Sequence, residues 1–272
     1  MKRYKITHVL FYIMEVTINN STKAELFGSI FQNIRPFTEH LSVTFTPDGL
    51  YLQTMDSSRV SIIELNINKA WFDLYKCEAG VVLGIPVNIL FKILNVREKV
   101  QSIQLIYESN GRDTLSIHFT SDDKTIFNKY FQCPLLDIET ETMQIPDIEY
   151  SAEFSLPSTM FSTLINQLKT FGDSLDISCT EEQIEMAANS SENGKMSVQV
   201  NIDDLSAFSI NEGEKLSLSF SLTQLHNISM FHKVAKEVSL GLCDQYPMAI
   251  NYLFGEECSL RAFLAPKIVD TD

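Results

Sequence analysis

A chain of 272 residues with 44% hydrophobic side chains is long enough for two domains with cores of their own, which excludes an intrinsically disordered protein. Its formal net charge of −14 is the opposite of what phosphate binding normally requires, because DNA-binding domains gather lysine and arginine. The total charge therefore argues against a conventional nucleic-acid-binding domain, and any such function depends on where the cations lie.

The five cysteines are odd in number and widely spaced, and none forms a Cys-x-x-Cys or cysteine–histidine pair at metal-ligand spacing. This pattern predicts reduced, buried thiols in an intracellular protein, with neither a structural metal site nor a disulfide framework. We expect no cofactor.

Residues 1–13 (MKRYKITHVLFYI) begin basic and then become apolar. The apolar run is too short to span a bilayer and has no small-residue cleavage site, so we expect no membrane association. We interpret residues 1–13 as an N-terminal extension that either adds a strand or is disordered.

The next segment predicts a helix, a hairpin, a second helix and three strands. Residues 22–35 carry a helical apolar stripe that ends before Pro36, and residues 41–53 alternate around a Pro-Asp-Gly turn. Residues 86–96 open with proline and again place apolar side chains on one face. The three strands are expected at 102–107, 114–119 and 125–132.

The second half repeats the first. Shifted by 134 residues, 27–52 fall on 161–186 with apolar positions matched, and shifted by 135 the match resumes from Leu83 on Leu218 to Phe119 on Phe254. The repeat predicts helices near 158–170 and 222–233, with a hairpin turn at Asn193-Gly194. The chain is therefore expected to contain one α+β fold written twice.

An acidic segment without helical or strand periodicity separates the halves. It contains Pro134, Pro146, Asp137, Glu139 and Glu141, which is typical of an extended linker. We place the first domain at 14–133, the connecting loop at 134–147 and the second domain at 148–272.

The charges are distributed unevenly. Of 35 aspartate and glutamate residues, only Glu25 falls within the four expected helices. Ordinary solvated helices mix glutamate with lysine, so a carboxylate-poor face indicates that these helices lie near something negative. The same helices contain Lys23, Arg35, Lys92, Lys169 and Lys233, together with His226 and His232.

A few cations spread over several helices suit weak contact with DNA that is independent of base sequence, because each phosphate contact adds a modest, salt-sensitive increment. Two repeats cannot surround a duplex. This interpretation therefore requires a closed oligomer.

Several short motifs occur in an order that resembles the DNA sliding clamp family of the proliferating cell nuclear antigen type. The resemblance spans about 14–272. It rests on LQTMDSSRVS at 52–61, FDLYKC at 72–77, KIL at 92–94, DTL at 113–115, IPDIEYS at 145–151, FGD at 171–173, ISC at 177–179 and LAPKI at 264–268.

The resemblance implies a head-to-tail homotrimeric ring with the helices lining the lumen and curved antiparallel sheets outside. Ring closure would pair the strand near 125–132 with the neighbour's strand near 195–200, which satisfies two open sheet edges. The implied lumen contacts to double-stranded DNA are Lys23, Arg35, Lys92, Lys169, His226 and Lys233.

The implied function is a DNA polymerase processivity factor that also docks replication and repair proteins and is placed on DNA by a clamp loader. Such a protein would act in the nucleus or at a viral replication site. Partners of the family insert a short aromatic and aliphatic peptide (a PIP-type peptide) under the linker. The matching positions are Met55, Arg59, Val60, Ile62, Met143, Ile145, Pro146, Pro247, Phe263, Leu264, Ala265 and Pro266.

The chain also departs from the family pattern. Arg59 stands where histidine is common and Phe263 where tyrosine is common, so partner preference is expected to differ. Gly28, Ser29 and Asn95 replace lysines, so the lumen is less basic than usual. Glu181 stands where many members carry a modifiable lysine, so regulation by ubiquitin at that position is not implied.

Other classes were weighed as well. An enzyme is disfavoured, because His118, Asp113 and Cys133 form no nucleophile–base–orienter set and no phosphate-binding glycine loop is present. The adjacent acidic pairs Glu181-Glu182 and Glu256-Glu257 are typical of solvated loops rather than of catalytic carboxylates. The alternative within the same fold is a subunit of a heterotrimeric checkpoint-type clamp, or a viral clamp paralogue with altered partners.

Overall fold

The computed structural model describes residues 12–108, 113–138 and 142–268. The first repeat contains β1 (Tyr12–Ile18), α1 (Ser21–Asn33), β2 (His40–Thr46), β3 (Gly49–Met55), β4 (Ser61–Asn68), η1 (Lys69–Trp71), β5 (Leu74–Cys77), β6 (Val81–Pro86), α2 (Val87–Asn95), β7 (Ser102–Glu108), β8 (Thr114–Thr120) and β9 (Lys129–Pro134).

The second repeat has the same sequence of elements. It contains β10 (Ala152–Pro157), α3 (Ser158–Leu168), β11 (Ser174–Cys179), β12 (Ile184–Ser190), β13 (Gly194–Val200), η2 (Ile202–Asp204), β14 (Ala207–Ile210), β15 (Leu216–Ser221), α4 (Leu222–Ser229), η3 (Met230–Lys233), β16 (Glu237–Leu242), β17 (Met248–Leu253) and β18 (Ser259–Leu264). The α+β repeat predicted from the sequence is thus confirmed.

The sheets follow one topology twice. The first repeat contributes a sheet in the order β5-β1-β7-β8-β9, and the second repeats this order as β14-β10-β16-β17-β18. The remaining strands form the orders β4-β3-β2-β6 and β13-β12-β11-β15. Because β18 pairs with β4, two of these groups fuse into a nine-stranded sheet that crosses from one repeat to the other.

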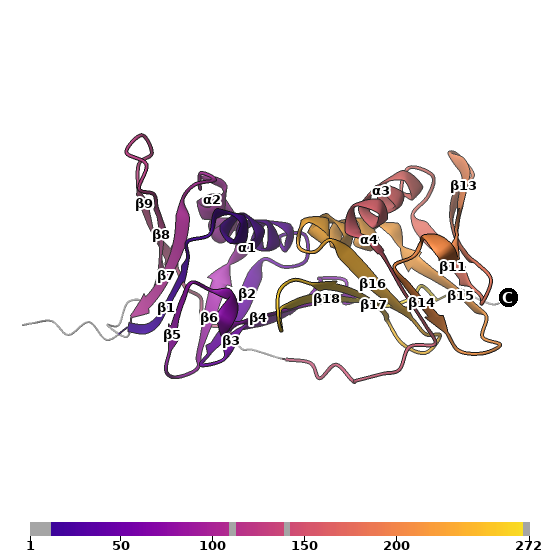
Figure 1. Ribbon diagram of the computed structural model, residues 1–272, viewed down its shortest axis with the longest axis horizontal. Coiled ribbons are helices and arrows are strands. Elements are labelled where there is room, and N and C mark those ends of the chain that lie inside the picture. The colour runs from indigo at the N-terminus through magenta and orange to yellow at the C-terminus, as the bar shows by residue number, and fades with distance from the viewer. Residues whose placement is uncertain (1–11, 109–112, 139–141, 269–272) are drawn as a thin grey trace, which may run out of the picture.

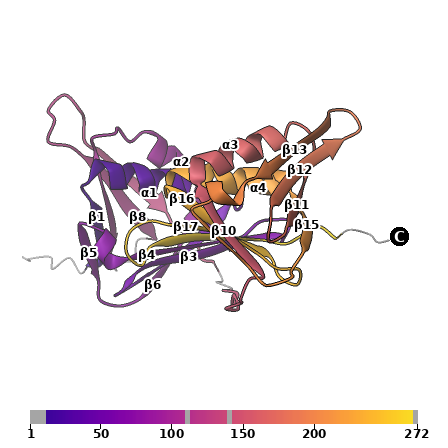
Figure 2. The same ribbon diagram turned by 45° about the vertical axis from the view of Figure 1, so that its right-hand side comes forward.

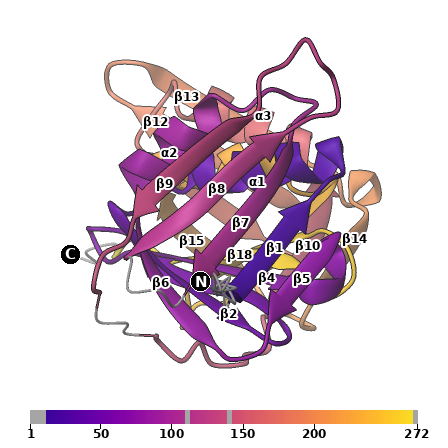
Figure 3. The same ribbon diagram turned by 90° about the vertical axis from the view of Figure 1, so that its left-hand side faces the viewer.

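The fused sheet joins the repeats, and among the strands that end the sheets, β9 and β13 lie at opposite ends of the molecule (Figure 1). β9 is the last strand of its sheet, and faces the viewer at the edge in Figure 3. β13 ends the four-stranded sheet beside α3 (Figure 2). β9 has the position in the first repeat that β18 has in the second. β13 has the position in the second repeat that β4 has in the first.

All four helices lie on one side of the sheets, and the linker crosses the other side (Figures 1 and 2). Helix α1 is capped at its N-terminus by Asn20, whose side chain accepts hydrogen bonds from the Thr22 and Lys23 backbone amides. Its apolar face, including Phe27 and Ile30, is buried against the sheet. The helix faces that point away from the sheets are not covered by them and are therefore available for contact with another molecule.

The structure corrects two expectations in detail and specifies a third. The strand expected at 125–132 begins only at Lys129 and runs to Pro134, because Asp123 holds a turn by accepting from the backbone and hydroxyl of Thr125. The last helix tightens into the 3₁₀ helix η3 after Ser229. Strand β1 begins at Tyr12, so the end of the expected 1–13 extension is strand, while residues 1–11 lie outside the described part of the chain.

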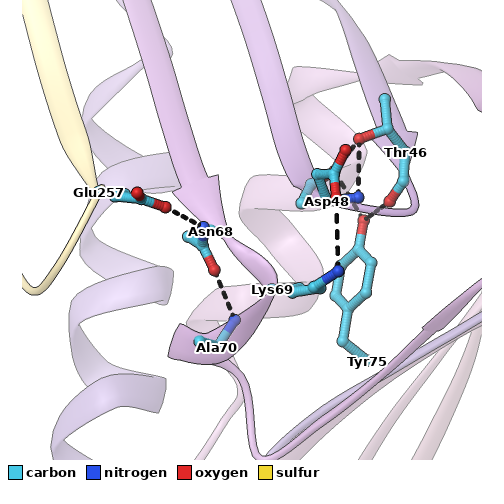
Figure 4. A network of polar contacts seen from close by, with 8 residues as sticks. Thr46, Asp48, Asn68, Lys69, Ala70, Tyr75 and Glu257 are labelled. Atoms are coloured by element: carbon cyan, nitrogen blue, oxygen red, sulfur yellow. Dashed lines mark hydrogen bonds and ion pairs between the residues drawn. The ribbon is translucent and has the colours of Figure 1, made fainter.

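Side chains also bind the repeats together. The Phe37 and Phe231 rings stack at 6.2 Å. Glu257, in the turn between β17 and β18, accepts a hydrogen bond of 2.6 Å from Asn68 at the end of β4 (Figure 4). The two repeats therefore share an interface built from sheet, aromatic and polar contacts.

Candidate functional site

The first candidate site is the side of the molecule formed by the helices. Lys92 and Lys233 are exposed there and Lys169 is half-buried. Glu25, the acidic residue of α1, lies 4.0 Å from Lys99, which offsets its charge. The helix surface is therefore mildly basic on a strongly acidic protein.

Two of the predicted cations are held in place by uncharged partners. The Lys23 ammonium donates to the Trp71 carbonyl and lies 5.4 Å from the centre of the Trp71 ring. The Arg35 guanidinium lies 4.8 Å from the centre of the Phe91 ring, and its Nε donates to Asn88 at 3.1 Å. Since none of these partners is anionic, both charges remain uncompensated at the helix surface.

His226 differs from the other predicted contacts. Burial lowers its pKa, and the neighbouring Lys169 charge lowers it further, so the ring is neutral near neutral pH. Its Nδ1 lies 2.7 Å from Oδ1 of Asn166. We therefore place His226 on the helix surface as a polar side chain rather than as a cation.

This placement gives a pH prediction. Replacing His226 with glutamine is expected to leave retention on DNA unchanged near neutral pH, because no charge is lost. Below its lowered pKa, wild-type retention should rise relative to His226→Gln as the ring gains a proton. Salt-dependent retention on circular DNA across acidic pH tests this, and a loss of retention at neutral pH would contradict it.

The same shift affects stability. The folded state disfavours protonated His226, so its contribution to stability is fully present above the ordinary pKa of 6.5 and is lost as pH falls through the lower folded value. The free energy of unfolding of His226→Gln should therefore fall less steeply with acidification than that of the wild type.

The second candidate site lies along the linker, on the side away from the helices. Near its start, Leu136 bridges to Gly84 on β6, where a Cβ would come within 2.2 Å of the Leu136 carbonyl oxygen. Near its end, the Tyr150 ring covers Gly241, where a Cβ would come within 2.7 Å of the ring. Both glycines are therefore needed for the close approach of the linker to the sheet.

Gln53 fastens the middle of the linker. Its Nε2 donates to the Met143 carbonyl at 3.0 Å, and its Oε1 accepts from the Met143 amide at 2.7 Å. One side-chain amide thus reproduces the two-way pairing of a β-ladder. Gln53 therefore holds the linker against β3.

Replacing Gln53 with alanine is expected to free this part of the linker. Loss of two exposed hydrogen bonds of about 1 kcal/mol each should speed exchange of the Met143 amide by about thirtyfold. Hydrogen–deuterium exchange measures this. Gln53→Glu, which keeps the acceptor, serves as the control, and equal protection in wild type and Gln53→Ala would contradict the prediction.

Two cavities flank the linker. One, of about 500 Å³, is lined by Gln53, Thr54, Met55, Asp56, Ser57, Arg59 and Met143. The other, of about 380 Å³, is lined by Ile145, Pro146, Asp147, Ile148, Tyr150, Ala249, Asn251, Arg261 and Phe263. Six of the predicted peptide-contact residues line one or the other cavity: Met55, Arg59, Met143, Ile145, Pro146 and Phe263.

The other predicted pocket residues are placed less uniformly. Leu264 is fully buried, so it can support a pocket only from below. Val60 is exposed, and its carbonyl accepts from the Ala265 amide at 2.8 Å, which brings the C-terminal segment beside the 56–61 loop. The half-buried residues Ile62, Pro247, Ala265 and Pro266 line neither of the two cavities.

Asp56 is an important residue that the sequence reasoning did not single out. Its Oδ1 accepts from the amides of Val60 and Ser61 and from the Ser61 hydroxyl, and its Oδ2 accepts from the Ser58 amide and hydroxyl. Gln224 on α4 also donates to Oδ2 at 3.2 Å. The Asp-Ser-Ser sequence is typical of such a turn and was the available signal.

These contacts fix the loop that carries Arg59. The φ angle of Arg59 is +59°, a left-handed conformation that side chains other than glycine rarely adopt. Burial acts to raise the pKa of Asp56, but the hydrogen bonds from Ser58 and Ser61 outweigh it and hold the pKa below its usual range. Asp56 is therefore an anion that organises one wall of the linker cavity.

A polar strip lies beneath the linker. Arg261 pairs with Glu64 across the β18–β4 junction, and the Tyr51 hydroxyl donates to Glu64 at 2.9 Å. Burial, followed by the Glu64 carboxylate, raises the pKa of Tyr51 to about 12. These polar side chains connect the linker site to β4 and β18, the strands whose pairing joins the two repeats.

The Nδ1 of His118 lies 3.3 Å from Oε1 of Gln104, and its ring meets the Tyr130 ring edge-on at 4.9 Å. Within the described ranges, no group of three or more histidine, cysteine, aspartate or glutamate side chains could hold a metal ion. In the same part of the chain, no helix is long and apolar enough to cross a membrane.

Two like repeats, with helices on one side and antiparallel sheets joined across the domain boundary, define the sliding-clamp class of protein. Comparison with known families gives a more specific result. Residues 14–143 match the family model described as "Proliferating cell nuclear antigen, N-terminal domain", and residues 144–268 match "Proliferating cell nuclear antigen, C-terminal domain".

The chain therefore belongs to the proliferating cell nuclear antigen family and is a DNA sliding clamp. Clamps of this family are non-enzymatic scaffolds that act on DNA. The two family models meet between Met143 and Gln144, inside the expected connecting loop at 134–147.

Proposed function

We propose that this chain forms a homotrimeric ring around double-stranded DNA, holds DNA polymerase on its template and docks replication and repair proteins. The internal β18–β4 junction carries the proposal, because it is a ready example of how one repeat joins the next. β9 and β13 have the same topological positions and are open. Pairing β9 with the β13 of a second copy would continue the circle.

The solvent exposure of β13 supports this pairing. Met196, Val198 and Val200 are half-buried, whereas the corresponding β4 residues Ile63, Leu65 and Ile67 are fully covered. What covers β4 is the neighbouring repeat. A second copy would cover β13 in the same way and remove apolar surface from water.

The helix surface supports contact with DNA. Lys23, Arg35, Lys92, Lys169 and Lys233 supply dispersed cations without base-reading side chains. Such contacts are weak, sensitive to salt and indifferent to sequence, which suits a ring that moves along DNA. The neutral His226 and the residues Gly28, Ser29 and Asn95 make this attraction modest.

The experiment that tests the ring is a mass measurement in solution followed by loading onto circular DNA. We expect three chains per particle, and retention that is lost when the circle is cut. A stable monomer, or release from intact circles, would overturn the proposal. A requirement for two other chains would instead identify a heterotrimeric clamp.

We further propose that partner proteins insert a PIP-type peptide along the linker, between its two cavities. The exposed Met143, the half-buried Ile145 and the nearly covered Phe263 ring suit contact with an aromatic and aliphatic peptide. A clamp loader would use the same surface. With such partners, the protein would act in the nucleus or at a viral replication site.

The peptide site has its own test. Ile145→Asp is expected to weaken binding of a PIP-type peptide at least about tenfold, because it places a charge in an apolar contact. Isothermal titration of a synthetic peptide measures the loss, and the mass of the ring should not change. Gln144→Asp, which adds the same charge at an exposed neighbouring position that lines neither cavity, is the control, and equal affinities of the two variants would refute the proposed site.

A further inference from the structure

Phe127 is the most exposed aromatic side chain among the described residues, at 85%. Its backbone is nevertheless fixed. The buried Gln101 side chain donates to the Phe127 carbonyl at 2.9 Å, and the Asn128 side chain accepts from the Ser121 amide at 3.0 Å. A large apolar ring is therefore presented to solvent from an anchored loop just before β9.

A groove of about 730 Å³ lies at the other end of the molecule, between α3 and β13. Its apolar lining includes Met160, Leu164, Val198 and Val200, and Asp204 lies at its margin. Met160 is 54% exposed. The groove borders the open edge that a second copy would cover.

The corresponding place in the first repeat is filled. The shift of 134 residues relates Pro157 of the groove to Lys23, and Asp204 ends η2 as Trp71 ends the equivalent η1. Trp71 is only 8% exposed, with Lys23 over its ring and Phe254 packed edge-on at 6.2 Å. Asp204 is too short and polar to fill the same space. The groove between α3 and β13 therefore has no side chain of the second repeat that fills it as Trp71 fills the equivalent place in the first.

The internal junction also sets the register between copies. Leu115 and Ile250 are repeat partners and pair with Cys133 and Ala262, respectively. Leu52 and Met186 are repeat partners and pair with Leu65 and Val198. Ala262 faces Ile63 and Leu260 faces Leu65 across the junction, so Cys133 should face Met196, and Phe131 should face Val198.

Extending that register by four residues carries Phe127 to the level of Ile202, at the start of η2. The internal junction has the same arrangement, since the turn before β18 contacts the end of β4 through Glu257 and Asn68 (Figure 4). The β8–β9 loop would reach the groove of the next copy in the same way.

We propose that Phe127 of one copy inserts into the groove between α3 and β13 of the next, in the place that Trp71 fills within the chain. The proposal rests on the ring described above and names the residue that anchors it. Burying an aromatic ring at each contact would stabilise the assembly without any charge pair.

The test is a double-mutant cycle. Analytical ultracentrifugation over a dilution series measures the concentration at which the ring of each variant dissociates. Phe127→Ala should raise the concentration at which the ring dissociates by about tenfold or more. The same change should have a smaller effect in a Met160→Ala background, because the groove has already lost a contact. Leu253→Ala, which removes another exposed apolar side chain, should have little effect.

The outcomes separate the two proposals. A wild-type chain that stays monomeric would overturn both the ring and the anchor. If the wild-type ring forms, but Phe127→Ala matches Leu253→Ala or its effect simply adds to that of Met160→Ala, the anchor is overturned while the ring stands. Circular dichroism of each variant confirms that the chain remains folded.

Discussion

Replacing Val198 with aspartate is expected to convert the ring into monomers. Val198 is half-buried on β13 and should lie against Phe131 of the next copy. Closing the ring would bury the new carboxylate without a partner, which costs several kcal/mol. Light scattering or native mass spectrometry should show the mass of one chain at concentrations where the wild type is trimeric.

The control for this substitution lies one residue away. Gln199 is exposed and its side chain points to the other face of β13, because successive strand residues alternate. Gln199→Asp adds the same charge to the same strand, but should leave the trimer largely intact. A trimeric Val198→Asp variant would refute the proposed edge pairing.

Replacing Asp56 with alanine is expected to lower the free energy of unfolding by about 2–4 kcal/mol, since several buried donors lose a charged acceptor. The donors include the Val60 and Ser61 amides and Gln224 of the other repeat. Because the same loop carries Arg59, peptide binding at the linker should fall as well. Denaturant unfolding and peptide titration measure the two effects.

Asp48→Ala is the matched control. Asp48 is an acidic residue whose side chain is 90% exposed and which pairs with Lys69 at 3.3 Å (Figure 4). A surface pair of this kind contributes about 0–1 kcal/mol. If Asp56→Ala destabilises the protein no more than Asp48→Ala does, the structural importance of Asp56 is refuted.

The pKa of Asp56 adds a pH dependence with a definite sign. Its folded pKa lies below the ordinary 3.8, so its contribution to stability is present above that value and is lost as pH falls through the folded pKa. The difference in unfolding free energy between wild type and Asp56→Asn should therefore shrink as the solution becomes strongly acidic.

Much of the fold could be predicted from the sequence because the repeated apolar positions encode local structure. The helices and the hairpin strands follow directly from periods of 3.6 and 2. The late start of β9 was also signalled, by Ser121, Asp122 and Asp123, which favour a turn. The following Thr-Ile-Phe triplet has high strand propensity and therefore favours a longer strand than the one that forms.

The contacts between distant segments could not be predicted in this way. Periodicity shows that β18 and β4 are strands, but not that they pair, because register depends on the shape of the assembled sheet. The same holds for Gln53 and Met143. The positions of Lys23 and Trp71 are not related by any local spacing, so sequence reasoning identified the cation and missed what holds it.

The fused sheet has a mechanical consequence for the proposed ring, which would have to open to admit DNA. Within a chain, the β18–β4 seam is reinforced by the pair between Arg261 and Glu64 and by the Asp56–Gln224 contact. At the seam between copies, the equivalent positions hold the uncharged Gln132 and Ser197. The ring should therefore open between chains, where the strand pairing of β9 with β13 would separate. Each chain should move as a rigid body when this happens.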